Sequence, residues 1–213
     1  MPDDGVTVES ETAIREIFGQ PGGLAVAKSL RRLDRYCRQF ISLSPFLCIG
    51  TMSAEGRADV SPRGDAPGFV QVVDDTTLVI PDRPGNNRVD TMSNILGNPA
   101  VGLLFFIPGF EDTLRVNGKA TILRDPALLA GFAVNGKAPK VAVRVAVDEA
   151  FLHCAKALKR ARLWDPAARV DRAVMPSIAR MILEQSACDA PVDEEKAAAA
   201  DAMVEDNYRR QLY

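Results

Sequence analysis

The sequence predicts a mainly β fold with α additions, an antiparallel barrel with helices at both ends of the chain. Six or so short apolar runs lie between residues 46 and 147, and Gly, Pro, Asn or Asp residues separate them. Short strands joined by tight turns are typical of antiparallel barrels. Outside this region, apolar residues recur at helical spacing. Together these patterns favour a six-stranded antiparallel barrel with N- and C-terminal helices.

The composition limits the functional classes. The chain has 213 residues, with 26 Lys and Arg against 28 Asp and Glu, which suits one domain with helical additions and argues against non-specific nucleic-acid binding. Four cysteines show no C-x-x-C spacing and there is one histidine, so we predict no metal site and no disulfide framework. No apolar run reaches bilayer length and the first ten residues are acidic and polar. We therefore expect a cytoplasmic protein with reduced thiols.

The N-terminal region is predicted to contain a disordered segment over residues 1–9 and a short helix over Thr12–Phe18. A longer amphipathic helix is expected from Leu24 onward, because apolar residues follow at helical spacing. Those residues are Leu30, Leu33, Cys37, Phe40 and Ile41. Five cations mark its other side, namely Lys28, Arg31, Arg32, Arg35 and Arg38. They fit a nucleic-acid surface or a solvated face, and the overall acidity favours the solvated face.

The barrel strands are read from the apolar runs. They are Phe46–Met52, Arg57–Ser61, Phe69–Val73, Leu78–Pro81, Ala100–Ile107, Thr113–Leu123 and Val141–Val147. The third and fourth form a hairpin around a short polar loop. Gly118 lies inside a long strand, where it predicts a bulge. Asp125 and Pro126 then begin a brief helix as N-cap and first residue.

The central stretch from Arg57 to Asn98 combines the hairpin with two cationic, glycine-containing segments. A helix is predicted after Val89, with Asn86 or Asn87 as its N-cap and Arg88 in its first turn. Free helix amides with arginines beside them suit a dianionic phosphate. The alternative is that these arginines lie on a solvated rim. Their concentration at two strand ends and one helix start favours a phosphate site.

Four ordered segments carry a family resemblance: PFLCIGTMSAEGRADVSPRGDAPGFV, LVIPDRPGNNR, NPAVGLLFFIPG and LRVNGKA. They resemble the pyridoxamine 5'-phosphate oxidase-like, FMN-binding split-barrel flavoproteins, and above all the bacterial branch with an SPRGD segment. The resemblance covers residues 10–166, which we treat as the FMN-binding split-barrel domain, followed by a C-terminal helical extension over 167–213. It implies a six-stranded split barrel and a homodimer with FMN at the subunit interface.

The resemblance also implies where FMN contacts the chain. Arg63 matches a strand-end cation beside the flavin, and Thr113 matches a polar position on a later strand. Backbone contacts are expected from Asp59, Val60, Ser61 and Pro62. Contacts to the ring and ribityl chain are expected from Ile80, Pro81 and Asp82, and contacts to the phosphate from Asn87 and Arg88.

Three features depart from the family pattern, and one of them is a segment between Arg88 and Asn98 that is slightly longer than in the true oxidases. Asn87 stands where many members have a second cation, a role that Arg83 could take over. The terminal sequence YRRQLY lacks the arginine-rich motif of the vitamin B6 oxidases, so we do not predict that activity.

A helix is expected from Glu149 to Leu163, with a basic stripe of His153, Lys156 and Arg160 and with Trp164 just beyond. In a dimer, Lys156, Arg160 and Trp164 would be candidate contacts to the partner's flavin. An ordinary exposed face explains the same pattern. Two further helices are expected over 176–186 and 194–211.

These observations predict an FMN-dependent oxidoreductase that transfers a hydride or electrons between flavin and a small organic substrate, without a protein nucleophile. Catalytic residues are not identified. The alternatives are a non-enzymatic flavin-binding or sensor module, and a split barrel that binds deazaflavin F420 or haem, with His153 as the only histidine available as an axial ligand.

Overall fold

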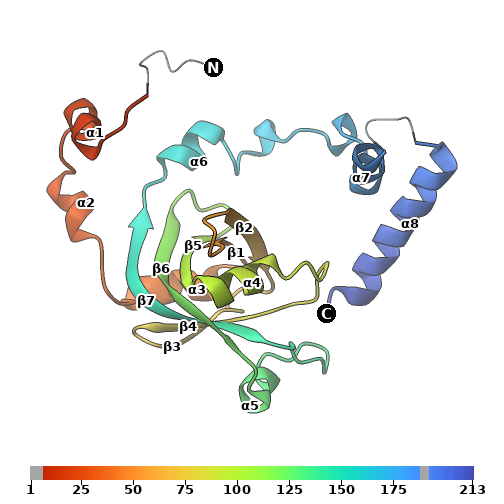
Figure 1. The fold of residues 1–213 in the computed structure, drawn as a ribbon, viewed down its shortest axis with the longest axis horizontal. Coiled ribbons are helices and arrows are strands. Elements are labelled where there is room, and N and C mark those ends of the chain that lie inside the picture. The colour runs from red at the N-terminus through yellow and green to blue at the C-terminus, as the bar shows by residue number, and fades with distance from the viewer. Residues whose placement is uncertain (1–6, 188–191) are drawn as a thin grey trace.

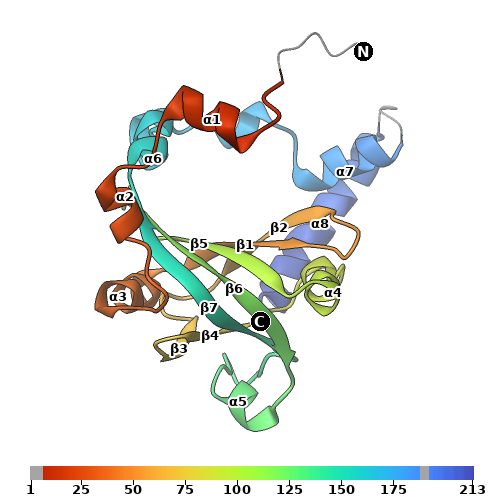
Figure 2. The ribbon, with the colours of Figure 1, turned by 60° about the vertical axis from the view of Figure 1, so that its left-hand side comes forward.

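Seven antiparallel strands form a single sheet at the centre of the computed structural model, which describes residues 7–187 and 192–213. The strands are β1 Phe46–Met52, β2 Ala58–Gly64, β3 Gln71–Asp74, β4 Thr77–Pro81, β5 Ala100–Phe106, β6 Thr113–Leu123 and β7 Ala142–His153. Their order is β2-β1-β5-β6-β7-β4-β3, and the sheet curves strongly around its core (Figure 2). The mainly β prediction is confirmed, and each of the seven predicted apolar runs forms a strand of this sheet, so the predicted total of six is wrong by one.

Helices lie before, between and after the strands (Figure 1). The α-helices are α1 Glu11–Phe18, α2 Gly23–Ala27, α3 Arg35–Leu43, α4 Asp90–Gly97, α5 Pro126–Ala130, α6 Lys156–Ala161, α7 Ile178–Ser186 and α8 Glu194–Gln211. Two short 3-10 helices cover Pro166–Ala168 and Arg172–Val174. No helix among the described residues is long and apolar enough to span a membrane.

The core fills the concave side of the sheet. Alternate residues of the strands point into it, as Leu47, Ile49, Phe105 and Leu114 do, each almost fully buried. One face of α3 closes the core with Cys37, Phe40 and Ile41. Burying one such large side chain contributes roughly 1.5–3 kcal/mol relative to leaving it exposed. The core therefore holds the strands that carry the candidate site.

The predicted bulge in β6 is confirmed. The register between β6 and β7 shifts between Asn117 and Gly118, so that Asn117 faces Glu149 while Gly118 faces Val147. Asp148 is the extra residue on β7. A Cβ atom at Gly118 would lie 2.1 Å from the carbonyl oxygen of Ala146, so only glycine fits this point of close backbone approach.

The predicted helix from Glu149 to Leu163 is wrong over its first part. β7 continues to His153, and residues 149–153 pair with β6 up to Thr113. Only α6 is helical in this range. After the bulge the residues still alternate between the two faces of the sheet, so the proposed basic stripe does not form: His153 lies on a strand, and Lys156 and Arg160 lie on a helix.

The long helix predicted from Leu24 is also wrong. It is replaced by α2 and α3, because Asp34 accepts hydrogen bonds from the amides of Tyr36 and Cys37 and so begins a new helix. Leu30 forms an isolated β-bridge with Ala150. The residues between α2 and α3, 28–34, thus run along β7, and we call them the N-terminal strap.

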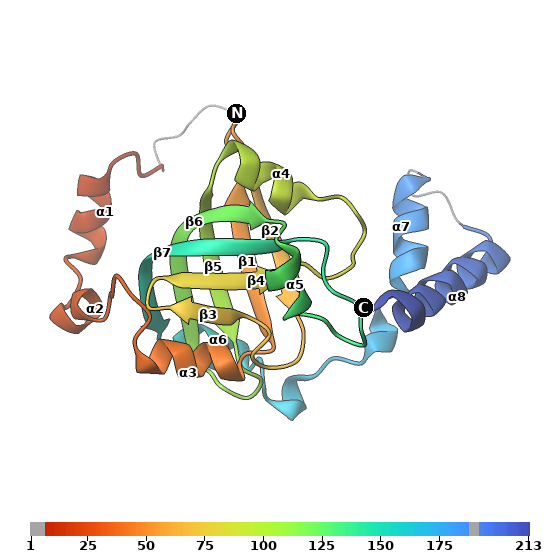
Figure 3. The same ribbon diagram turned by 90° about the horizontal axis from the view of Figure 1, so that it is seen from below.

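Several other predictions are confirmed. The helix over Thr12–Phe18 appears as α1, and Asp125 caps α5 through the amides of Ala127 and Leu128. The helices α7 and α8 contact each other and project from the sheet (Figure 3). Most of the predicted disordered segment 1–9, together with Cys188, lies outside the described residues.

Candidate functional site

Helix α4 lies against β1 and β2 and brings several predicted site residues together. Thr91 in its first turn donates a hydrogen bond to Ser61 Oγ on β2 (3.1 Å), and Ser61 donates to Asp59 (3.3 Å). Asn94 donates to Thr51 Oγ1 on β1 (3.0 Å). These bonds fix the amino end of α4 over the face of β2 that carries Asp59 and Ser61.

The amino end of α4 has no side-chain cap. The other described helices of eight or more residues, α1, α3, α7 and α8, are capped by Ser10, Asp34, Ser177 and Asp193. The prediction of Asn86 or Asn87 as cap is wrong: Val89 holds that position, and Asn86 instead accepts a hydrogen bond from the Arg88 amide (3.1 Å). The first-turn amides of α4 are thus left without the side-chain acceptor that other helices have.

Backbone strain accompanies this uncapped end. Asn87 and Val89 both have positive φ, 57° and 55°. The left-handed conformation is costly for a β-branched residue such as Val89, on the order of 1–3 kcal/mol. The segment before α4 is therefore held in an unusual shape by its surroundings.

Arg88 lies just before α4, rather than in its first turn. Its side chain is 72% exposed and its guanidinium pairs with Asp90 (2.8 Å). Asp59 is close enough to act on its charge. An ion pair this exposed is weak, so Arg88 can exchange Asp90 for an anionic ligand at little cost.

The residues predicted on β2 divide between its two faces, because side chains alternate along a strand. Asp59, Ser61 and Arg63 are half-buried on one face, whereas Val60 and Pro62 are exposed on the other. The structure thus brings the first three together with α4. Val60 and Pro62 could contribute to the same side only through their backbone.

Arg63 lies at the far end of β2 from Arg88. Its guanidinium donates to the Pro62 carbonyl oxygen (2.8 Å) and its charge acts on Asp82, just after β4. Burial raises the pKa of Asp82, and the Arg63 charge acts in the opposite direction. Asp59 and Arg63 are four residues apart, about 13 Å along a strand. Arg63 and Arg88 therefore lie near opposite ends of β2 and would contact different parts of a ligand rather than one phosphate.

Ile80 and Pro81, predicted to touch the ring and ribityl chain, are buried in β4. They pair with Val143 and Ala142 of β7. Their side chains are part of the packed interior, so a ligand would meet this strand at Asp82 and at its backbone.

Arg83 cannot act as the substitute cation that the sequence suggested. It pairs with Asp65 (2.6 Å) and donates to the Phe132 carbonyl oxygen (2.8 Å), and only 16% of its side chain is exposed. Burial alone would raise the pKa of Asp65, but hydrogen bonds from Tyr213, the Ala66 amide and Arg83 lower it. The conclusion is that Arg83 and Asp65 form a structural pair.

Thr113 and the α6 residues occupy another part of the sheet. Thr113 is buried and pairs with His153. Trp164 donates its indole N–H to the Phe110 carbonyl oxygen (2.7 Å) in the β5–β6 turn, while Lys156 and Arg160 are exposed on α6. Within the described part of the chain, no hydrogen bond joins these side chains to β2 or α4.

His153 is half-buried near Lys28 and Arg115, and its Nε2 atom is buried without a hydrogen-bond partner among the described residues. Burial lowers its pKa, and the two nearby cations add to this shift. Because Nε2 is covered by protein atoms, His153 does not present this nitrogen to a haem.

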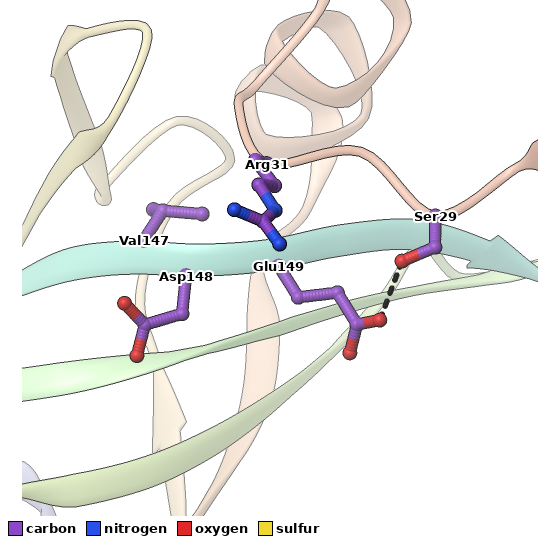
Figure 4. Close-up of a pocket in the computed structure, with 5 residues that line it drawn as sticks. All are labelled: Ser29, Arg31, Val147, Asp148 and Glu149. Atoms are coloured by element: carbon purple, nitrogen blue, oxygen red, sulfur yellow. Dashed lines mark hydrogen bonds between the residues drawn. The ribbon is translucent and has the colours of Figure 1, made fainter.

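Sequence reasoning missed a cavity of about 620 Å³ between the N-terminal strap and β7. It is lined by Ser29, Arg31, Val147, Asp148 and Glu149 (Figure 4). Glu149 accepts hydrogen bonds from Ser29 and from Asn117 (2.9 Å), and these bonds lower its pKa. The Glu149 carboxylate therefore has its hydrogen-bond donors within the protein.

In the part of the chain that the structure describes, no group of three or more His, Cys, Asp or Glu side chains is arranged to hold a metal ion. Cys37, Cys48 and Cys154 are free thiols. Burial, followed by the neighbouring Asp34, raises the pKa of Cys37 to about 11, so this thiol is a core residue rather than a nucleophile.

Comparison with known proteins gives a family match over residues 33–154, to the family described as pyridoxamine 5'-phosphate oxidase. This range is more than half of the 213 residues. A search of curated proteins gave no match.

Similar solved structures include HupZ of Group A Streptococcus, with 18% identity, a TM-score of 0.46, and coverage of 56% of this chain and 92% of HupZ. General Stress Protein 26 from Bacillus anthracis has 17% identity, a TM-score of 0.42, and coverage of 54% and 88% respectively. At these values the likeness carries no functional argument.

Proposed function

Because the chain belongs to the pyridoxamine 5'-phosphate oxidase family, we propose that it binds FMN along β2 and the amino end of α4 and acts as a flavin-dependent oxidoreductase. The proposal includes a split barrel and a homodimer whose interface completes the flavin groove, as the family resemblance implies. Its substrate is a small organic molecule.

The observation that carries the proposal is the uncapped amino end of α4 beside Arg88. Helix amides and a guanidinium both favour an anion, and here the helix lacks the side-chain acceptor found on the other long helices. A phosphate would supply that acceptor. To bind the phosphate, Arg88 would exchange its ion pair with Asp90 for one with the ligand.

The remaining residues fit an elongated ligand rather than an isolated phosphate. Ser61 and Thr91 offer hydroxyl groups next to α4. Arg63 lies farther along β2, and its charge acts on Asp82 just after β4. Bound FMN would supply two-electron chemistry, while these residues would bind and orient it.

The direct test is titration of the purified protein with FMN, followed by its absorption band at about 450 nm and by quenching of its fluorescence. Saturable binding with one FMN per chain is expected. Binding of F420 or haem but not FMN would contradict the proposal. Sedimentation at micromolar concentration tests the dimer, and a monomer that saturates with FMN would rule out the shared groove.

A second experiment separates an enzyme from a binding module. After anaerobic photoreduction, the flavin of an oxidoreductase is reoxidised by an organic substrate added without oxygen, because oxygen reoxidises reduced flavin even without an enzyme. A bound flavin that no acceptor reoxidises would contradict the enzymatic role while leaving FMN binding intact.

A further inference from the structure

Helix α8 is joined to the sheet by Tyr213 as well as by its partner helix α7. The Tyr213 hydroxyl donates a hydrogen bond to Asp65 Oδ1 (2.8 Å), and its ring lies 5.7 Å from the Arg83 guanidinium. Lys137 Nζ donates to the Tyr213 carbonyl oxygen (2.9 Å). Figure 3 shows the carboxyl end of α8 next to the segment that follows α5.

The acceptor for Tyr213 is built into the fold. The Asp65 side chain is only 3% exposed. Asp65 Oδ2 accepts a hydrogen bond from Arg83 Nε. Asp65 Oδ1 accepts hydrogen bonds from the Ala66 amide and the Tyr213 hydroxyl. A carboxylate held this way is a fixed hydrogen-bond acceptor, so the Tyr213 hydroxyl meets a prepared partner.

The rest of α8 has little to hold it. Ala197 is its only buried residue among those described, and it lies near the opposite end of the helix from Tyr213. Most helical stability in proteins comes from the packing of one helix face, and α8 has little such packing. The position of the carboxyl half of α8 therefore depends on Tyr213.

The docking site adjoins the edge proposed for FMN. Asp65 follows Arg63 by two residues, and Arg83 follows Asp82 directly. We propose that residues 193–213 form a strap that docks through Tyr213 on Asp65, Arg83 and Lys137, and whose release opens access to the Arg63–Asp82 end of the site. The gating part of this inference rests on the proposed function.

The test compares the full-length chain with Tyr213→Phe, which removes only the docking hydroxyl. Tyr208→Phe is the matched control, because Tyr208 lies on α8 shortly before Tyr213 and is 56% exposed. Loss of a hydrogen bond to a charged group shifts an equilibrium by roughly ten-fold or more. Amide hydrogen exchange in residues 205–213 is therefore expected to rise about ten-fold in Tyr213→Phe and to stay unchanged in Tyr208→Phe.

The gating part is measured by stopped-flow association of FMN. A faster association rate in Tyr213→Phe than in the wild type and Tyr208→Phe supports it, and equal rates overturn it. Equal amide exchange in both variants overturns the docking strap. Absence of FMN binding in every form overturns the proposed function and the gating, whereas the exchange measurement still decides the docking.

Discussion

Two polar regions of this protein differ in whether their polar groups have hydrogen-bond partners within the protein. Beside the N-terminal strap, Glu149 is satisfied by Ser29 and Asn117, although a cavity lies next to it. At the amino end of α4, no side chain of the described residues caps the helix, and the ion pair of Arg88 with Asp90 is exposed. The difference teaches that the Glu149 region is satisfied by the protein itself, and we therefore look for the ligand at the amino end of α4.

The largest expected effect is a loss of stability when the bulge between β6 and β7, beside Glu149, is disturbed. Gly118→Ala would push a Cβ atom against the Ala146 carbonyl oxygen, which should lower the free energy of unfolding by about 3 kcal/mol. Gly85→Ala is the control from the α4 side, where a Cβ atom meets nothing within 4 Å. Urea unfolding measures both, and equal stabilities would show that the bulge does not need glycine.

The comparison is tested most directly at its two arginines. Arg88→Ala should weaken FMN binding by about 10- to 100-fold, because hydrogen bonds to charged groups contribute roughly 1.5–3 kcal/mol. Arg31→Ala, at the cavity beside the strap, should leave the FMN dissociation constant unchanged. Fluorescence titration measures both constants. A larger effect of Arg31→Ala would place the ligand in the cavity.

Glu149→Ala tests whether its region is structural. Removal of its two hydrogen bonds should cost about 1 kcal/mol of stability, a figure reduced for partial exposure. FMN affinity should not change. Asp148→Ala, at the neighbouring bulged residue, should alter stability by less than about 0.5 kcal/mol. If Glu149→Ala instead abolishes FMN binding while the protein stays folded, the two regions have been assigned the wrong roles.

The smallest expected effect is on the pH dependence of stability. The pKa of His153 is lowered by burial and by nearby Arg115 and Lys28, so the unfolded chain takes up a proton at a higher pH than the folded one. Stability is then greatest above the ordinary histidine pKa of about 6.5 and falls as the pH decreases through the folded-state pKa. His153→Gln should reduce the stability difference between pH 7.5 and pH 5.5. An unchanged difference would show that His153 is not the responsible group.

Local patterns were sufficient to predict most of the fold. The hairpin of β3 and β4, the bulge at Gly118 and the Asp125 cap depend on residues close in sequence. The helix expected from Glu149 failed because strand pairing with β6 outweighed local helical spacing up to His153. The long helix from Leu24 failed for a similar reason, since pairing of Leu30 with Ala150 is a contact across the fold.

The candidate site was predictable as a set of segments and not as a geometry. Arg88, Ser61 and Asp59 do lie together, because α4 packs on β2. The pairing of Arg83 with Asp65 could not be read from the sequence, where both residues belong to cationic, glycine-containing segments of similar appearance. Only the tertiary fold decides which arginine is committed to structure and which is open to a ligand.

The Asp65–Arg83 pair also has a mechanical consequence. It ties the chain just beyond β2 to the chain just beyond β4, although many strands separate β2 from β4 in the sheet. Opening of the sheet from the β2 side and opening from the β4–β3 side must therefore both break the Asp65–Arg83 ion pair. The two sides then open in a single cooperative event.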